Sequence, residues 1–393
     1  MKKVISIALV VMLMATTLVG CNSGGGEQDT GGDAGGEDAA SDMKITLITD
    51  KGNIDDKSFN QGSWEGVVEF SEEHGTEHDY IKPEEANDAG YLSAIDLAVD
   101  GGADIVVTPG FLFEVAVHEA QTKYPDVKFI LLDAFPSPAD SDDPDIADNT
   151  ASIFYADEES GYLAGYAAVK EGFTEIGFMG GMPVPAVQAF GYGYLQGAED
   201  AAEDMGMEEG DITSIYHYTG DFDENDTNKA TAKTMYQEGM EVIFACGGSV
   251  GKSVMSAANE ADKAVIGVDV DQRYDSETVI TSATKGLGSS VVTVLESIVL
   301  NDNFDQYGGQ MTTFNAENDG VALPTEVIGD EDADAFDRFE NFDREQYDEI
   351  YEKLASGDIE VIRNVDVEDT SGNATAEELT TQLDLKIVDV ETR

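Results

Sequence analysis

"EVIFACGGSVGKSVMSAANEADKAVIGVDVD", residues 241–271, holds an apolar strand, a glycine-rich loop, a helical pattern and a second apolar strand. This order is typical of a parallel βαβ unit, whose crossover is almost always right-handed. In sheets built from such units, ligands bind beyond the carboxyl ends of the strands. The loop at 246–253, CGGSVGKS, is therefore expected to face a binding site.

The same loop differs from a phosphate-binding Walker loop. That motif needs a glycine, four further residues and then Gly-Lys-Ser or Gly-Lys-Thr. Cys246 stands where the first glycine would have to be, and counting from Gly247 leaves only three intervening residues. The spacing therefore argues against a nucleotide-hydrolysing enzyme.

Apolar strands and helical patterns alternate from residue 44 to residue 155, and the alternation repeats from 175 to 271. Such alternation predicts parallel sheets covered by helices. The length of this body, from about residue 43 to about 366, suits two lobes better than one. The fold class expected is α/β, with two doubly wound lobes.

The N-terminus has the pattern of a bacterial lipoprotein signal. Lys2 and Lys3 precede an apolar run at 4–19, and Leu18-Val19-Gly20-Cys21 resembles a lipobox. Residues 1–20 are expected to be removed and Cys21 to carry lipid, palmitate included. The alternative is an ordinary secretory signal with a chance cysteine. Residues 21–42, rich in glycine, alanine and acids, are expected to form a flexible tether from the membrane.

The composition is strongly acidic, with 81 acids against 21 bases and a formal charge of −60. Such a surface repels nucleic acid, so no nucleic-acid partner is expected. The acids are spread along the chain, which suggests adaptation to a saline habitat. Only Cys246 remains once Cys21 is lipidated, so no disulfide is expected, and the four histidines show no zinc-ligand spacing. No metal, cofactor or catalytic residue is indicated, and no enzyme is expected.

Six segments, in order, resemble the basic membrane protein family. They are LITDKGNIDDKSFNQGSWEG (47–66), GGMPVPAVQAFGYGYLQG (180–197), MEVIFACGGSVGKSV (240–254), AVIGVDVDQ (264–272), VITSATKG (279–286) and YDEIYEKLASGDIEVI (347–362). The family contains extracytoplasmic lipoproteins, including purine nucleoside receptors of ABC importers. Residues 302–342 and the tail after 366 depart from the resemblance.

The resemblance implies the fold of a type I periplasmic binding protein, with a ligand cleft between two lobes joined by three crossovers. The crossovers are expected near Tyr155, Thr281 and Ala322. The N-terminal lobe would then contain residues 43–155 and 281–321, and the C-terminal lobe 156–280 and 322–366. Residues 367–393 are expected as a C-terminal tail.

The resemblance also implies the binding residues. Phe59 and Phe190 would sandwich the purine base, one from each lobe. The expected polar and backbone contacts come from Asp50, Asn60, Asp133, Gly247, Gly248, Asp269 and Lys285, with the last two on the ribose. From the residues alone, Phe59 could instead staple a helix start, Phe190 could be core, and Asp269 could be a helix cap or surface acid.

The expected ligand is adenosine, guanosine or inosine, and the expected partner is the permease of an ABC importer. The protein is expected on the extracytoplasmic face of the cell membrane, held by lipid on Cys21, as a monomer. A type I binding protein for a sugar and a signal-relay lipoprotein stay open as alternatives, because sugar sites also use aromatic rings and acids. A nucleotide-hydrolysing enzyme is the least supported alternative.

Overall fold

A computed structural model describes residues 43–141, 143–301, 303–330, 333–368 and 373–393. The expected signal peptide, Cys21 and the tether all lie outside the described residues. No helix in the described part of the chain combines the length and apolarity that crossing a bilayer requires.

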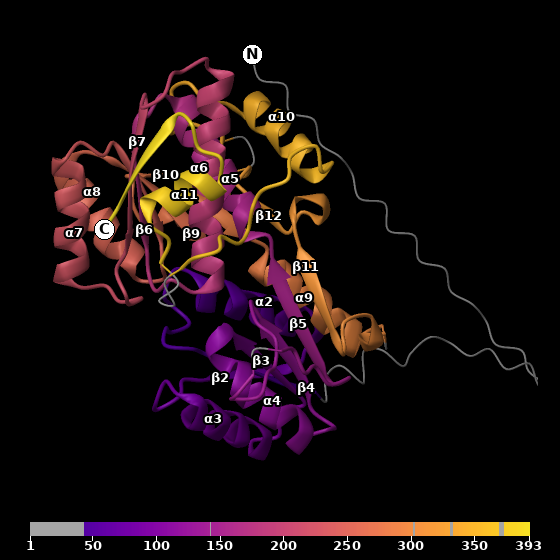
Figure 1. The fold of residues 1–393 in the computed structure, drawn as a ribbon. Coiled ribbons are helices and arrows are strands. Elements are labelled where there is room, and N and C mark those ends of the chain that lie inside the picture. Colours follow the sequence, from indigo (N-terminus) through magenta and orange to yellow (C-terminus); the bar gives the residue numbers. More distant parts are fainter. Residues whose placement is uncertain (1–42, 142, 302, 331–332, 369–372) are drawn as a thin grey trace, which may run out of the picture. The chain divides into compact units, whose positions relative to one another are not determined.

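The first sheet has six parallel strands in the order β11-β5-β4-β3-β1-β2. The strands are β1 (Lys44–Ile48), β2 (Glu77–Ile81), β3 (Ile105–Pro109), β4 (Lys128–Leu132), β5 (Thr150–Tyr155) and β11 (Gln310–Phe314). Two pairs of helices cover it, α2 (Phe59–His74) against α9 (Leu287–Val299), and α3 (Asp88–Asp100) against α4 (Glu114–Lys123). Figure 1 shows this lobe in indigo and magenta, with the orange α9 returning to it.

The second sheet has seven strands in the order β12-β10-β9-β8-β6-β7-β13, and only β12 is antiparallel to its neighbour. The strands are β6 (Glu175–Gly180), β7 (Ile212–Tyr218), β8 (Val242–Cys246), β9 (Ala264–Asp269), β10 (Val279–Lys285), β12 (Val321–Ala322) and β13 (Val388–Thr392). The associated helices are α5 (Asp157–Glu171), α6 (Pro185–Asp204), α7 (Asp226–Gln237) and α8 (Val250–Ala261), with α10 (Arg344–Ala355) and α11 (Ala376–Gln382) nearer the C-terminus.

The inner strands, such as β3 and β8, are buried along their whole length because helices cover both faces of each sheet, whereas the edge strands β2 and β11 are polar and partly exposed. In β4, Phe129 and Leu131 face the core beside α3 and α4, whereas Ile130 and Leu132 face the core beside α2 and α9. Side chains alternate between faces along a strand, so one continuous apolar run fills two cores. This packing fixes which strand ends meet at the edge where ligands bind.

Helices α5 and α6 approach closely at glycines. A Cβ atom on Gly165 would lie 1.9 Å from the carbonyl oxygen of Tyr194, and one on Gly193 would lie 1.9 Å from that of Glu158. No larger residue fits at either position without moving backbone. The contact holds the first turn of α5 beside the part of α6 that carries Phe190.

The chain passes between the two sheets three times. It leaves the first sheet after Tyr155, returns to it after Lys285 and leaves again before Val321. The second passage lies later than Thr281, the expected position. Residues Val279–Lys285 form one strand paired with β9, so the chain cannot leave the second sheet until that strand ends.

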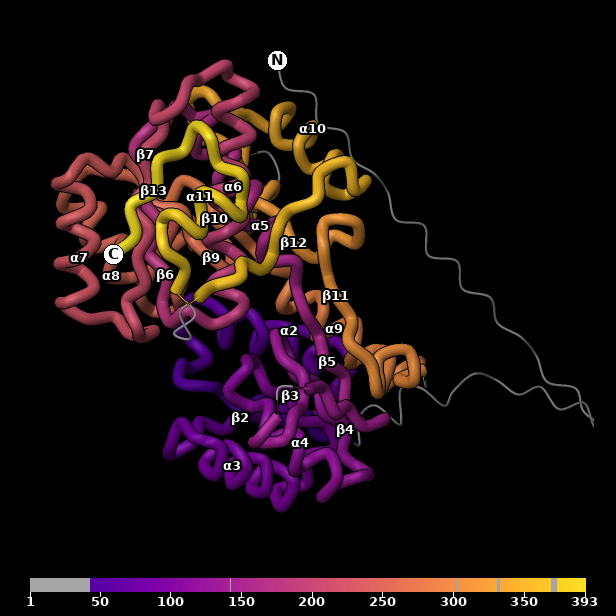
Figure 2. The backbone as a smooth tube through the Cα atoms, in the orientation of Figure 1, coloured from indigo at the N-terminus to yellow at the C-terminus, as the bar shows by residue number. Residues whose placement is uncertain are grey.

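Residues 367–393, expected as a separate tail, instead contain α11 and β13. Strand β13 extends the second sheet by pairing in parallel with β7, as the yellow end of the tube in Figure 2 shows. The buried Glu199 carboxylate accepts backbone hydrogen bonds from Lys386, Ile387 and Val388 at 2.8–3.0 Å. This segment therefore belongs to the second lobe.

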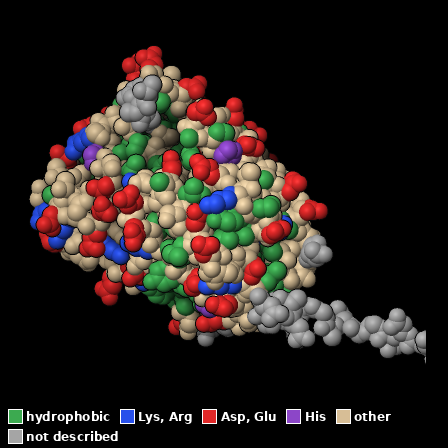
Figure 3. Space-filling view, turned by 90° about the horizontal axis from the view of Figure 1, so that it is seen from below, with side chains coloured by type: hydrophobic (Ala, Val, Ile, Leu, Met, Phe, Trp, Pro, Cys, Tyr) green, Lys and Arg blue, Asp and Glu red, His purple; other side chains and the backbone are tan. Residues whose placement is uncertain are grey.

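Acidic side chains are spread over the face seen in Figure 3, and basic side chains are fewer. With 81 acids against 21 bases, repulsion between like charges outweighs the exposed ion pairs at low ionic strength. Salt screens this repulsion, with a Debye length of about 10 Å at 0.1 M and about 3 Å at 1 M. We therefore expect Tm to rise as salt goes from dilute to molar, measured by calorimetry in NaCl and KCl. A flat Tm would contradict adaptation to salt.

Candidate functional site

A cavity of about 290 Å³ lies at the carboxyl ends of strands from both sheets, near the lower end of the range for small-molecule sites. The structure brings all nine predicted ligand-binding residues to its wall. They are Asp50, Phe59, Asn60, Asp133, Phe190, Gly247, Gly248, Asp269 and Lys285. The strand-end positions expected from the βαβ pattern thus converge on one place.

Asn60 has its amide hydrogens engaged within the protein. Its Nδ2 donates to Asp50 Oδ1 at 2.8 Å and to Asp56 Oδ2 at 2.7 Å, and its Oδ1 accepts from the Asp50 backbone N–H at 3.1 Å. Both amide hydrogens are therefore already used, which leaves Asn60 no free donor for the polar contact with the ligand that the resemblance implies. The arrangement instead holds the Asp50 carboxylate at the cavity wall, and burial raises the pKa of Asp50 despite the hydrogen bonds from Gly52 and Asn60.

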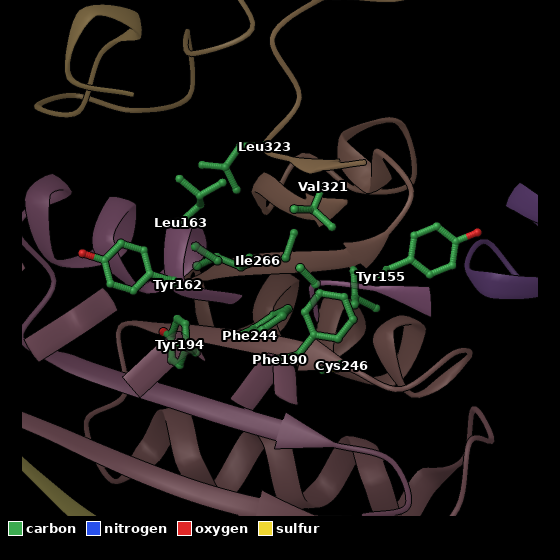
Figure 4. Packing of buried hydrophobic residues seen from close by; sticks show 14 of the residues in the cluster. Tyr155, Tyr162, Leu163, Phe190, Tyr194, Phe244, Cys246, Ile266, Val321 and Leu323 are labelled. Carbon is green, nitrogen blue, oxygen red and sulfur yellow. The ribbon is translucent and has the colours of Figure 1, made fainter. Parts of the chain in front are cut away.

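The aromatic rings of Phe59 and Phe190 flank one cation. Lys285 Nζ lies 4.7 Å from the centroid of Phe59 and 5.1 Å from that of Phe190. Phe59 is the first residue of α2 and is half-buried, whereas Phe190 lies inside α6 and is 1% exposed. Phe190 also packs edge-on against Phe244, with centroids 5.9 Å apart (Figure 4). Phe190 thus serves as core as well as cavity wall.

The ammonium of Lys285 joins three carboxylates. Its Nζ lies 2.5 Å from Asp133 Oδ2, 3.1 Å from Asp157 Oδ1 and 3.6 Å from Asp269 Oδ1, and its side chain is 3% exposed. Burial lowers the pKa of Lys285, but the three carboxylates outweigh it and hold that pKa well above its usual value. A fully charged lysine thus lies at the cavity wall.

The acids around Lys285 are in excess. Burial raises the pKa of Asp133 to about 7, although Lys285 opposes the shift. Burial also raises the pKa of Asp269, against Lys285 and a hydrogen bond donated by Ser58. Near neutral pH the carboxylates around Lys285 therefore share a proton for part of the time.

Three of the six described non-glycine residues with left-handed backbone lie at or beside this site. Asp133 and Asp269 each follow or end a buried strand with φ of 55° and 67°, in the left-handed region that side chains disfavour. Lys57, beside the cavity-lining Asp56, has φ of 66°. Left-handed non-glycine residues persist where surrounding contacts impose them, commonly at functional sites.

The glycine loop after β8 has a structural explanation. A Cβ atom on Gly247 would lie 2.7 Å from the backbone nitrogen of Gly181, and Gly248 has φ of 54°. Gly247 is thus required for close packing of two strand-end loops, besides lining the cavity. Cys246 and Lys252 line the same cavity, and burial raises the pKa of the Cys246 thiol.

Sequence reasoning did not predict three residues that contact the charged groups of the site: Ser58, Asp157 and Arg363. Asp157 is fully buried between Lys285 and Arg363, yet in the sequence it is one acid among 81. Arg363 carries a weak signal, because bases are scarce and it directly follows the last segment of the family resemblance. Among the described residues, no group of three His, Cys, Asp or Glu side chains is placed to hold a metal.

Comparison with known proteins agrees with this geometry. The family model of PnrA-like ABC transporter substrate-binding proteins matches residues 44–364. The chain is 32% identical over 360 residues to the ABC transporter nucleoside-binding protein BmpA of Lactococcus lactis, covering 85% of this chain and 94% of the relative. It is 31% identical to basic membrane protein A of Borreliella burgdorferi, covering 71% and 78% respectively.

Solved structures share the fold. A solute-binding protein of an ABC transporter system from Aeropyrum pernix matches with a TM-score of 0.73 at 24% identity, covering 88% of this chain and all of that one. A second, from Conexibacter woesei, matches with a TM-score of 0.62 at 22% identity, covering 82% and 99%. At these identities the likeness carries the fold alone, and it confirms the predicted type I architecture.

Proposed function

Because this chain belongs to the PnrA-like family of ABC transporter substrate-binding proteins, we propose that it binds a purine nucleoside in the cavity and delivers it to a membrane permease. The ligand would be adenosine, guanosine or inosine. The observation that carries the proposal is the pairing of two aromatic rings with buried carboxylates and a lysine in one cavity. A flat base suits the rings, and vicinal hydroxyls suit carboxylate acceptors.

The contacts follow from this chemistry. The base would stack on Phe59 and Phe190, with Asp50 and its supporting Asn60 at one edge. Asp269 Oδ1, which lies 3.6 Å from Lys285 Nζ, would accept from ribose hydroxyls. Asp133 would lie near the base.

A ligand panel tests the proposal against the alternatives. Tm is measured in high salt with adenosine, guanosine, inosine, the free bases, pentoses and ATP. Stabilisation by nucleosides supports the proposal, because a ligand that binds only the folded state raises Tm. Stabilisation by sugars alone would favour the sugar-binding alternative, and hydrolysis of ATP would favour an enzyme.

Replacing Asp269 separates sugar from base recognition. Asp269→Asn is the cleaner change, because asparagine tolerates the left-handed backbone found there better than alanine does. We expect nucleoside binding to weaken by about 1–3 kcal/mol, the cost of a poorly satisfied buried partner. Free-base binding should change less, measured by titration calorimetry. Equal losses for bases and nucleosides would contradict the ribose role.

Replacing Lys252 tests the resemblance of the glycine loop to a phosphate site. Lys252 lies in the first turn of α8 and lines the cavity, but a nucleoside brings no phosphate to it. Lys252→Ala is therefore expected to change nucleoside affinity less than threefold or so, well under 1.4 kcal/mol. Loss of nucleoside binding with the fold intact would show that this assignment is wrong.

Delivery to a permease requires the protein to stay at the extracytoplasmic membrane surface. We propose that lipid on Cys21 anchors it there as a monomer, from the lipobox-like Leu18-Val19-Gly20-Cys21. Mass spectrometry of the mature N-terminus tests this, and an unmodified N-terminus at another residue would rule it out.

A further inference from the structure

Arg363 lies on the segment after α10 and does not line the cavity, yet it contacts the network that does. Its Nη1 donates to the Tyr155 carbonyl oxygen at 2.9 Å and to the Glu158 carboxylate. Its Nη2 donates to Asp157 Oδ2 at 3.1 Å. One guanidinium thus holds the end of β5 and the first two residues of α5.

Asp157 transmits this contact to the cavity. Its side chain is fully buried, with one oxygen on Arg363 and the other 3.1 Å from Lys285 Nζ. The Nζ of Lys285 in turn lies 4.7 Å from the ring centroid of Phe59 and 5.1 Å from that of Phe190. A continuous chain of charged contacts therefore runs from Arg363 to the cavity wall.

The chain of contacts lies where the backbone passes between the sheets. Tyr155 ends β5 and Lys285 ends β10, at the first and second passages. Ser160, on the same helix as Asp157, donates to the carbonyl oxygen of Thr284 at 3.0 Å and approaches that of Ala322 at 3.5 Å, at the third. A change in these contacts would therefore reach the passages between the sheets as well as the cavity.

We propose that Arg363 is a positioning residue for the ligand site, acting through Asp157 to hold Lys285 in place and to balance the buried acids where the chain passes between the sheets. The proposal rests on the proposed nucleoside function. In the proposed nucleoside complex, Arg363 does not contact the ligand. Without Arg363, the Lys285 ammonium would move toward Asp157 and Glu158, away from the aromatic rings and the ribose site.

The excess of acids over cations around Lys285 gives the proposed role of Arg363 a measurable pH dependence. Four acids, Asp133, Asp157, Glu158 and Asp269, face two cations, Lys285 and Arg363. Other titratable groups lie around them. Burial raises the pKa values of the Tyr155 phenol and the Cys246 thiol, and Asp56 lies behind Ser58. Burial raises the pKa of Asp133 and of Glu158 to about 7 each, and Lys285 and Arg363 respectively oppose those shifts. Without Arg363, one cation faces four acids. Protonating one of these acids then removes more repulsion between carboxylates than it does in the parent protein.

The test compares nucleoside affinity at pH 8 and pH 6 by titration calorimetry. For Arg363→Gln we expect roughly tenfold to hundredfold weaker binding at pH 8, because the buried Asp157 carboxylate loses a charged hydrogen-bond partner. Part of that loss should be recovered at pH 6, where Glu158 and Asp133 take up protons. The parent should change less between the two pH values.

Three further variants distinguish the possible causes of a change in affinity. The double variant Arg363→Gln with Glu158→Gln removes one charge of each sign and is expected to bind several-fold better at pH 8 than Arg363→Gln alone. Arg363→Lys keeps the charge and should retain the parent's pH profile with a smaller loss. Arg344→Gln is the matched control. Arg344 is exposed, and its partners among the described residues are Asp348 and the Thr325 carbonyl, so the affinity of this variant should match the parent's.

Unchanged affinity in Arg363→Gln would overturn the proposal. So would an equal loss at both pH values without recovery in the double variant, because that pattern indicates a merely structural role. If the parent binds no nucleoside, the proposed function fails instead. The ligand-free proteins then still test the charge balance, since the Tm deficit of Arg363→Gln should be larger at pH 8 than at pH 6.

Discussion

Replacing Lys285 with methionine is expected to lower the free energy of unfolding by about 3–5 kcal/mol at pH 8, the cost of leaving buried charges without their partner. The change leaves Asp133, Asp157 and Asp269 facing one another without the cation they share. The Lys285 side chain is 3% exposed, so water screens little of this repulsion. Denaturant unfolding of the ligand-free variant measures the loss, and nucleoside affinity should fall with it.

The loss should depend on pH in a defined direction. Burial raises the pKa of Asp133 from 3.8 to about 7 in the folded protein, so folding favours its protonated form. A carboxyl group whose pKa is raised on folding increases the free energy of unfolding at low pH. That contribution is lost as pH rises from about 4 to about 7. Without Lys285 the pKa rises further, so Lys285→Met should be less destabilised at pH 5 than at pH 8.

Lys123→Met provides the control. Lys123 also forms an ion pair, with Asp96 at 2.8 Å, but both side chains are well exposed. Exposed pairs contribute about 0–1 kcal/mol, so this variant should unfold close to the parent at both pH values. If Lys285→Met proved no more destabilised than Lys123→Met, the shared-cation arrangement would be wrong.

The fold could be predicted because its signal is local. Each strand-and-helix unit carries its own pattern, and the family resemblance ordered the units. The passage expected near Thr281 instead follows Lys285, because nothing inside VITSATK marks the end of the strand. Strand β13 was missed because the Glu199 carboxylate that holds its start is distant in sequence.

In the candidate site, too, some features could be predicted from the sequence and others could not. The pattern of strands and helices placed the 246–253 loop at a binding site, and the family resemblance supplied the other cavity residues. The engagement of Asn60 by Asp50 and Asp56 could not, because it depends on three side chains meeting in space. Arg363 likewise acquires its importance only from the burial of Asp157. In a chain so rich in acids, sequence does not distinguish a buried carboxylate from a solvated one.

Phe59→Ala should weaken purine nucleoside binding by about 1–3 kcal/mol, the contribution of stacking one base on one aromatic ring. That is about fivefold to over a hundredfold in Kd. Phe59 is half-buried at the start of α2, so the fold should tolerate the change. Phe173→Ala is the matched control, since Phe173 is also half-buried but does not line the cavity. Equal affinity in Phe59→Ala and the parent would mean that the base does not stack there.

Phe190→Ala should have a double effect. Phe190 is 1% exposed and packs on Phe244, so truncation is expected to cost about 3–5 kcal/mol of stability in addition to the lost stacking. Phe129→Ala, in a core away from the cavity, should lose similar stability but keep nucleoside affinity when measured on folded protein. Phe190→Leu fills most of the space without a ring, so it should retain more stability and still bind weakly. Nucleoside binding by Phe190→Leu as tight as the parent's would leave Phe190 a core residue, and the sandwich would need another partner for Phe59.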